Sequence, residues 1–292
     1  MRDISEDYFT GLNLLQLNFL SLYYSPGYER EAVVLGKVAD EAYDYLRGFF
    51  RYGPEIILLV LDETDWERRA TNQPYGNPFV PDNRVHYGVK PPESWKEPLA
   101  SLASKAPTDL KKRLVSIAGS ESDEVREAVD KIFTLNFFAA TVTHEIAHPF
   151  LGLNLVLPQP IEYEYALKLD AFWLGEFLPQ YAMCSFLLAR DRLLFERWHE
   201  LMKSVFEGGK GVVRYENLSE MGPKYSEMIE SCVENIYWYQ AKLFVMSVDL
   251  HRQHGEVFLR KIQEDLRLSE RLLIDRIENS YGNIRKWLQK WG

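Results

Sequence analysis

Two histidines four residues apart, with a glutamate directly after the first, form the most chemically suggestive segment of this 292-residue chain. They are His144, Glu145 and His148, in the run His144-Glu145-Ile146-Ala147-His148. On an α-helix, residues i and i+4 lie on one face, so both imidazoles can reach one metal ion. Glu145 projects next to that ion, where a carboxylate can act as general base for a metal-bound water. The H-E-x-x-H pattern therefore predicts a catalytic zinc site.

The surroundings of this segment are apolar. Between Lys131 and Glu162 the only acidic residue is Glu145, and the only histidines are His144 and His148. A carboxylate in such surroundings is costly unless it is paired, hydrogen-bonded or close to a metal. We therefore expect a buried helix here. The alternative is a chance match in an all-helical interaction protein, which would bind no stoichiometric metal.

A catalytic zinc site needs a third protein ligand. Glu176 is the candidate, because it is the only charged residue between Asp170 and Arg190 in an otherwise apolar segment. Glu162, Glu164 and Asp170 are poorer candidates, since they lie near other charges or at the start of a predicted helix.

Two segments resemble those of zinc aminopeptidases of the thermolysin-like superfamily, the gluzincins. One is the run His144 to His148 followed by Gly152, and the other is Trp173-Leu174-Gly175-Glu176 followed by Tyr181. The resemblance implies that His144, His148 and Glu176 bind Zn²⁺ and that Glu145 is the base. It also implies a thermolysin-like α+β fold, with a small mixed sheet in the N-terminal lobe and a mostly helical C-terminal lobe.

The same resemblance suggests an oxyanion donor. Those enzymes carry a tyrosine upstream of a Gly-Glu…Phe segment, and Tyr239 precedes Gly255-Glu256-Val257-Phe258 at a similar distance. A hydroxyl there could donate a hydrogen bond to the developing tetrahedral oxygen. Tyr237, His251 and His254 are alternatives, and aromatic residues at helical spacing can also be core residues.

Gln180, one turn after Glu176, is either an acceptor for a ligand histidine N–H or a solvent-facing residue.

Gluzincins line their cleft with an edge strand that pairs with substrate. His86, Tyr87 and Gly88, with Asn77-Pro78-Phe79 before them, loosely resemble that segment. Such pairing uses the backbone and places few demands on side chains.

The chain departs from the aminopeptidases in three places. Pro149 follows His148 and should bend or end the helix there. The interval from His148 to Glu176 is longer, which a loop over Leu157 to Ile161 would absorb. The Gly-x-Met-Glu-Asn segment that binds a free amino terminus is missing, so aminopeptidase specificity does not carry over.

The expected elements divide the chain into strands first and helices afterwards. We predict a first lobe over residues 1–120 and a helical lobe with the zinc site over residues 121–292, together forming one catalytic unit. Leu15 to Phe19 fits a strand or a helix equally well. The other predicted strands are Ile56 to Leu61 and an edge strand over Arg84 to Val89, separated by an irregular loop from Asn72 to Asn83. The predicted helices are Glu29 to Tyr52, Ser122 to His148, Tyr163 to Arg190 and Met221 to His251.

The composition of the chain argues against some classes of function. The net charge of -9, without a basic cluster, argues against nucleic-acid binding. No segment predicts a signal peptide or a membrane span, and two cysteines suit the cytoplasm. We expect a zinc metallopeptidase acting on a peptide or protein, of unspecified oligomeric state. The alternative is a zinc-binding scaffold or partner-binding module without turnover.

Overall fold

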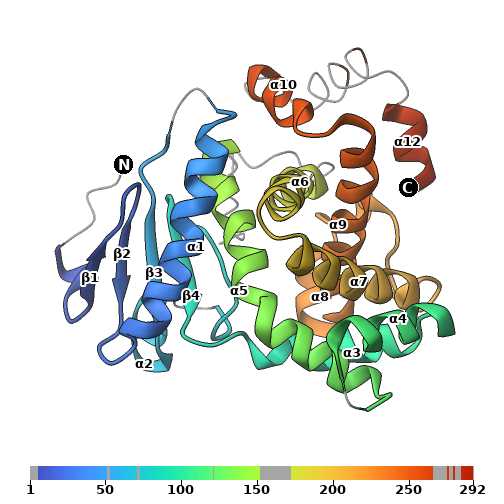
Figure 1. Ribbon diagram of the computed structural model, residues 1–292, viewed down its shortest axis with the longest axis horizontal. Coiled ribbons are helices and arrows are strands. Elements are labelled where there is room, and N and C mark those ends of the chain that lie inside the picture. The colour runs from blue at the N-terminus through green and yellow to red at the C-terminus, as the bar shows by residue number, and fades with distance from the viewer. Residues whose placement is uncertain are drawn as a thin grey trace. The chain divides into compact units, whose positions relative to one another are not determined.

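The computed structural model describes residues 6–50, 53–70, 73–120, 122–151, 172–265, 275, 279 and 284–291. Within these residues a four-stranded sheet lies near the N-terminus, and the rest is helical from Glu93 onward (Figure 1). The expected α+β class is confirmed. The chain divides into two compact units. A sheet unit contains residues 1–92 and 137–161, and a helical unit contains residues 93–136 and 162–292.

The sheet has the strand order β1-β2-β3-β4. β1 (Asn13–Gln16) and β2 (Ser21–Tyr24) form an antiparallel hairpin. The segment Leu15 to Phe19, whose periodicity fitted both states, therefore forms the end of β1 and the start of the hairpin connection. β3 (Ile57–Leu61) runs parallel to β2, and β4 (Arg84–Gly88) runs parallel to β3. β3 is central and almost wholly buried, which explains its unbroken apolar sequence. β4 is an edge strand, as expected.

Two helices connect the parallel strands, as parallel pairing requires. α1 (Glu29–Arg47) joins β2 to β3 and packs against both strands (Figure 1). Its buried residues include Ala32, Leu35, Ala39 and Leu46, which form an apolar stripe at helical spacing. α2 (Glu63–Arg69), capped by the Asp62 carboxylate, joins β3 to β4. A 3-10 helix, η1 (Glu6–Phe9), precedes the sheet.

The H-E-x-x-H segment lies on α5 (Val125–Leu151). Its C-terminal half, from Phe137, belongs to the sheet unit. There Phe150 packs on Tyr43 of α1, with ring centroids 4.9 Å apart, and Thr141 accepts a hydrogen bond from Tyr87 of β4. α5 continues through Pro149 to Leu151, so the helix does not end at His148.

The helical unit is built around α9 (Glu234–His254), which packs against α6 (Phe172–Arg190) and α7 (Arg192–Gly209). α7 also packs on α3 (Glu93–Ser104) and α4 (Thr108–Ala118). The remaining described elements are η3 (Leu218–Glu220), α8 (Tyr225–Ser231), α10 (Val257–Asp265) and α12 (Ile284–Trp291).

The helix predicted over Met221 to His251 is wrong in its continuity, because α8 ends at Ser231 and α9 begins at Glu234. A tertiary contact fixes the start of α9. The side-chain oxygen Oδ1 of Asn235 accepts hydrogen bonds from the backbone N–H groups of Arg214 and Tyr215, and its side-chain Nδ2 donates to the Tyr215 carbonyl oxygen. The first predicted helix also ends earlier than expected, at Arg47.

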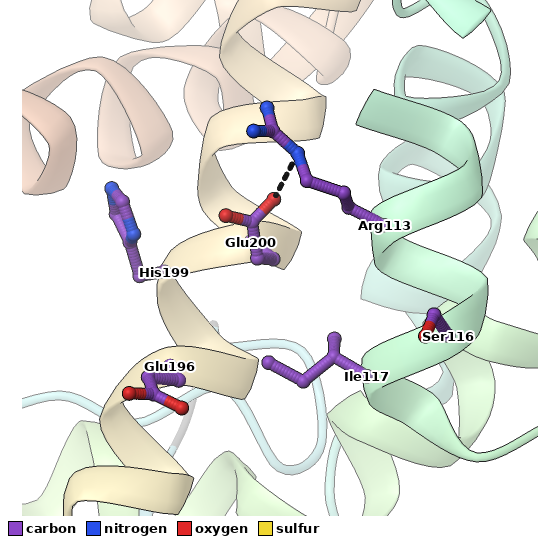
Figure 2. Close-up of a pocket in the computed structure, with 6 residues that line it drawn as sticks. All are labelled: Arg113, Ser116, Ile117, Glu196, His199 and Glu200. Atoms are coloured by element: carbon purple, nitrogen blue, oxygen red, sulfur yellow. Dashed lines mark ion pairs between the residues drawn. The ribbon is translucent and has the colours of Figure 1, made fainter. Parts of the chain in front are cut away.

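α4 and α7 enclose a cavity of about 390 Å³ (Figure 2). Its charged side chains already have partners: Arg113 Nε lies 3.6 Å from Glu200 Oε2, and Arg192 Nε lies 2.9 Å from Glu196 Oε1. Burial lowers the pKa of His199 to about 4, so this imidazole is neutral at pH 7. The cavity contains none of the predicted catalytic residues.

Candidate metal centre

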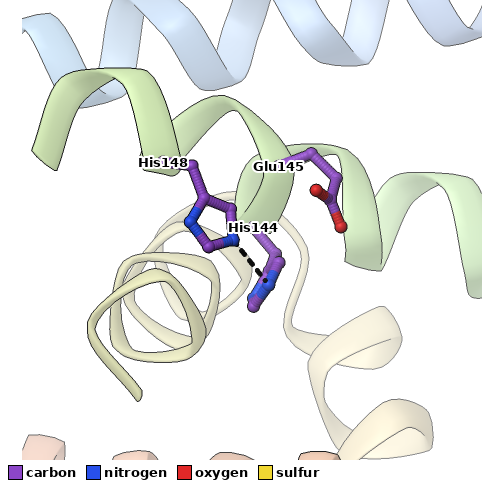
Figure 3. Close-up of side chains that lie close together, drawn as sticks. All are labelled: His144, Glu145 and His148. Atoms are coloured by element: carbon purple, nitrogen blue, oxygen red, sulfur yellow. Dashed lines mark hydrogen bonds between the residues drawn. The ribbon is translucent and has the colours of Figure 1, made fainter. Parts of the chain in front are cut away.

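His144 and His148 face one another from consecutive turns of α5 (Figure 3). Their Nε2 atoms are 3.2 Å apart, and the ring planes are inclined by 80°. Both side chains and Glu145 are buried, with 6%, 4% and 8% of their surface exposed for His144, His148 and Glu145 respectively. One ligand atom from each of these three residues lies within 4.8 Å of the other two.

This separation fits a shared metal ion. Two nitrogens that each lie about 2.05 Å from a tetrahedral Zn²⁺ are about 3.3 Å apart. The same distance also suits a hydrogen bond in which one imidazole donates to the other. The donor set itself, two imidazoles and a carboxylate, is one that Zn²⁺ accepts. The three side chains therefore fit the ion that the sequence implies.

Glu145 lies on α5 between the two histidines in sequence, and one of its carboxylate oxygens lies within 4.8 Å of a nitrogen of each imidazole (Figure 3). Its side chain leaves the helix in a different direction from the two histidines, since consecutive residues do not share a face. One turn earlier, Thr141 accepts a hydrogen bond of 3.0 Å from the Tyr87 hydroxyl. Burial, and next the negative charge of Glu145, raise the pKa of Tyr87 well above its usual value. Tyr87 is therefore a neutral hydroxyl beside the predicted base.

Both ring nitrogens of His86 have hydrogen-bond partners within the sheet unit. Its Nδ1 lies 3.0 Å from the Arg84 carbonyl oxygen and its Nε2 lies 2.7 Å from the Tyr8 hydroxyl. A ring that donates from Nδ1 and accepts at Nε2 satisfies both contacts. Burial lowers the pKa of His86 to about 3, and the ring stacks on Phe79 at 4.3 Å.

The outer edge of β4 is partly occupied. The His86 N–H donates to the Phe79 carbonyl at 3.0 Å, as a single antiparallel bridge. A Cβ atom on Gly88 would lie 2.8 Å from the Gly76 Cα. The backbone around Gly76 and Phe79 thus lies where a pairing substrate would lie. Substrate pairing at His86, Tyr87 and Gly88 stays a prediction, and it requires this segment to move.

Glu176 lies on α6 and accepts a hydrogen bond of 2.9 Å at Oε2 from the Gln240 amide of α9. Gln240 in turn accepts one of 2.5 Å from Gln180 Nε2. Gln180 is only 6% exposed, so its alternative as a solvent-facing residue is wrong. Its Oε1 atom is buried and accepts no hydrogen bond from the described residues.

Tyr239 is fully buried, and its hydroxyl donates to the Asn217 carbonyl oxygen at 2.7 Å. Burial raises the pKa of this hydroxyl far above its usual value. Its proton is engaged within the helical unit, so an oxyanion role would require that bond to break. Burial likewise raises the pKa of Tyr237, to about 12. The oxyanion role of either tyrosine stays a prediction.

Two of the segments that carry the resemblance meet in the helical unit. The Tyr181 hydroxyl of α6 donates to the Gly255 carbonyl at 2.7 Å, and its ring centroid is 4.6 Å from that of Phe258. His251 also lies near Tyr181, with ring centroids 5.7 Å apart. His254 is the last residue of α9.

Several predictions fall on residues outside the described ranges. These are the carboxylates Glu162, Glu164 and Asp170, the glycine Gly152, and the loop over Leu157 to Ile161. Two residues of the candidate site were missed from the sequence. Thr141 could have been found, because it lies four residues before Glu145 on the same helical face. Gln240 gave no signal, since a single amide among aromatic residues predicts nothing by itself.

Comparison of the chain with protein-family models, curated proteins and solved structures finds no match. Among the described residues, no helix is both long and apolar enough to cross a membrane.

Proposed function

We propose that this protein is a zinc-dependent peptidase of the thermolysin-like class. The observation that carries the proposal is the 3.2 Å separation of His144 Nε2 and His148 Nε2 in a buried H-E-x-x-H segment. The contact between Tyr181 and Gly255 also supports it, since both lie in segments that carry the resemblance. So does Tyr87, which connects an edge strand to the histidine-bearing helix. Two free cysteines support a cytoplasmic location.

In this proposal His144, His148 and Glu176 hold the metal. Zn²⁺, when bound, lowers the pKa of a water ligand and polarises the substrate carbonyl. Glu145 removes a proton from the attacking water and delivers it to the leaving amine nitrogen. Its burial suits this task, because a carboxylate with little competing solvent interacts strongly with a nearby proton donor.

The test compares the wild type with Glu145→Gln, and with Glu127→Gln as an exposed control on the same helix. We expect Glu145→Gln to retain stoichiometric zinc and to lose about 100-fold or more in peptide cleavage, the range for loss of a general base. Zinc content is measured by atomic absorption and cleavage with a quenched fluorescent peptide library. A Glu145→Gln protein that keeps both zinc and full cleavage would refute the assignment of the base.

A second function is favoured by one observation. Glu145 offers a carboxylate oxygen within 4.8 Å of both imidazoles, so it can itself be the third ligand. The protein would then be a zinc-binding scaffold without turnover. This alternative predicts that Glu145→Gln loses zinc and that Glu176→Ala keeps it.

A further inference from the structure

The Glu176 carboxylate and the side chains of Gln240 and Gln180 form a series of hydrogen bonds, which we call the glutamine relay. Gln240 on α9 donates from Nε2 to Glu176 Oε2 at 2.9 Å. Gln180 on α6, one turn after Glu176, donates from Nε2 to Gln240 Oε1 at 2.5 Å. The relay thus connects two positions on α6 through one side chain of the neighbouring helix, and α6 and α9 pack against each other.

The donors and acceptors of the glutamine relay can be assigned in only one order. An ionised carboxylate only accepts hydrogen bonds, so Gln240 must present its amide nitrogen to Glu176 and its oxygen to Gln180. The donor from Gln180 fixes the Gln240 amide in that orientation. Gln180 is left with a buried Oε1 that accepts no hydrogen bond from the described residues. Such an acceptor suits an imidazole N–H, which metal-ligating histidines commonly donate to an amide or a carboxylate.

We propose that Gln240 is a positioning residue for Glu176 and that Gln180 fixes the orientation of Gln240. The inference rests on the proposed function, in which Glu176 is a zinc ligand. A carboxylate held by a charge-assisted hydrogen bond loses less rotational freedom when it binds a metal.

The test is Gln240→Met, which preserves the length of the side chain and removes both the NH2 donor and the oxygen acceptor of its amide. We expect the zinc affinity of the full chain, measured by competition with a chromophoric chelator, to fall about tenfold or more. In a Glu176→Ala background the same substitution should cause no further fall, since it acts through that carboxylate. Gln253→Met, at an exposed position on the same helix, should leave zinc affinity unchanged.

Thermal melting of the metal-free variants separates this role from a purely structural one. A structural role lowers the melting temperature of Gln240→Met equally in both backgrounds and leaves zinc affinity unchanged, which would overturn the inference alone. An equal fall in zinc affinity in both backgrounds would also overturn it. A wild type that binds no zinc, or binds it equally well after Glu176→Ala, would instead refute the proposed ligand set, and the inference would fall with it.

Discussion

At the scale of single residues, the partners of the ring nitrogens distinguish two buried histidines of the sheet unit. His86 accepts a hydrogen bond from Tyr8, donates one to the Arg84 carbonyl, and is fully buried. His144 is buried beside a second imidazole. The first arrangement satisfies a neutral ring with ordinary partners, whereas the second places two nitrogens at a spacing that one ion can bridge. Only the second predicts chemistry.

The environment of His86 predicts a pH dependence of stability. Its pKa is about 3 in the folded protein and about 6.5 in an unfolded chain. The unfolded state therefore binds more protons between these values, so stability falls as the pH falls from 6.5 toward 3. One such group contributes a slope of at most about 1.4 kcal/mol per pH unit. We expect His86→Gln to be less stable than the wild type at pH 8 but to show a shallower loss in acid.

Urea denaturation of the wild type and His86→Gln between pH 4 and pH 8 measures this slope. His254→Gln, at a partly exposed position at the end of α9, is the control and should keep most of the wild-type slope. Parallel curves for the wild type and His86→Gln would show that His86 is not the titrating group.

Elements differ in how far local sequence determines them. The start of β3 is predicted within one residue, because the six consecutive apolar residues from Ile56 to Leu61 indicate a buried element whose length suits a strand. The break between α8 and α9 is not predicted, because its cause is distant in sequence. The Asn235 side chain accepts hydrogen bonds from the backbone N–H groups of Arg214 and Tyr215. The sequence leaves open whether α5 bends or ends at His148, and the structure shows that it continues past Pro149. Local steric preference disfavours it, but proline-containing helices occur where packing stabilises them.

The same limit applies to the candidate site. Its nearest pair, His144 and His148, follows from helical spacing alone. The hydrogen bond from Gln240 to Glu176 joins residues 64 positions apart on different helices, and no periodicity encodes it. The occupied edge of β4 likewise depends on how the segment around Gly76 and Phe79 folds back.

Helix packing gives a prediction at this scale. α7 ends with Gly208 and Gly209, and a Cβ on Gly208 would lie 1.9 Å from the Leu102 carbonyl oxygen of α3. Alanine normally stabilises a helix by about 1 kcal/mol over glycine. Here the backbone of α3 must shift, so we expect Gly208→Ala to destabilise the protein by about 1–3 kcal/mol.

The matched control is Gly36→Ala in α1. Its Cβ would lie 2.9 Å from the Leu22 Cδ1 and 3.1 Å from the Leu17 Cδ1, both at the ends of side chains that can rotate. We therefore expect a smaller loss, measured for both variants by urea denaturation. A Gly208→Ala protein as stable as the wild type would mean that α3 and α7 tolerate a wider separation.

At the scale of the whole molecule, the two compact units change how stability should be measured. The sheet unit combines residues 1–92 with residues 137–161, so its chain is interrupted by part of the helical unit. α5 contributes its N-terminal half to the helical unit and its C-terminal half, with His144 and His148, to the sheet unit. Unfolding therefore need not be a single transition, and each transition should be followed separately.

Metal binding should stabilise the native molecule by mass action, because a ligand that binds only the folded state shifts the unfolding equilibrium. At a free zinc concentration of about 100 times Kd the gain is about 2.7 kcal/mol, which corresponds to a few degrees in Tm for a chain of this size. Scanning calorimetry of the chelator-treated protein, with zinc then restored, measures the shift. Mg²⁺ should give no shift in Tm, because it prefers oxygen ligands in octahedral geometry.

His144→Ala/His148→Ala should abolish the zinc shift, whereas His199→Ala, beside the cavity between α4 and α7, should retain it. An equal zinc shift in the double variant would mean that zinc binds elsewhere on the molecule and that the 3.2 Å contact is a hydrogen bond between two imidazoles.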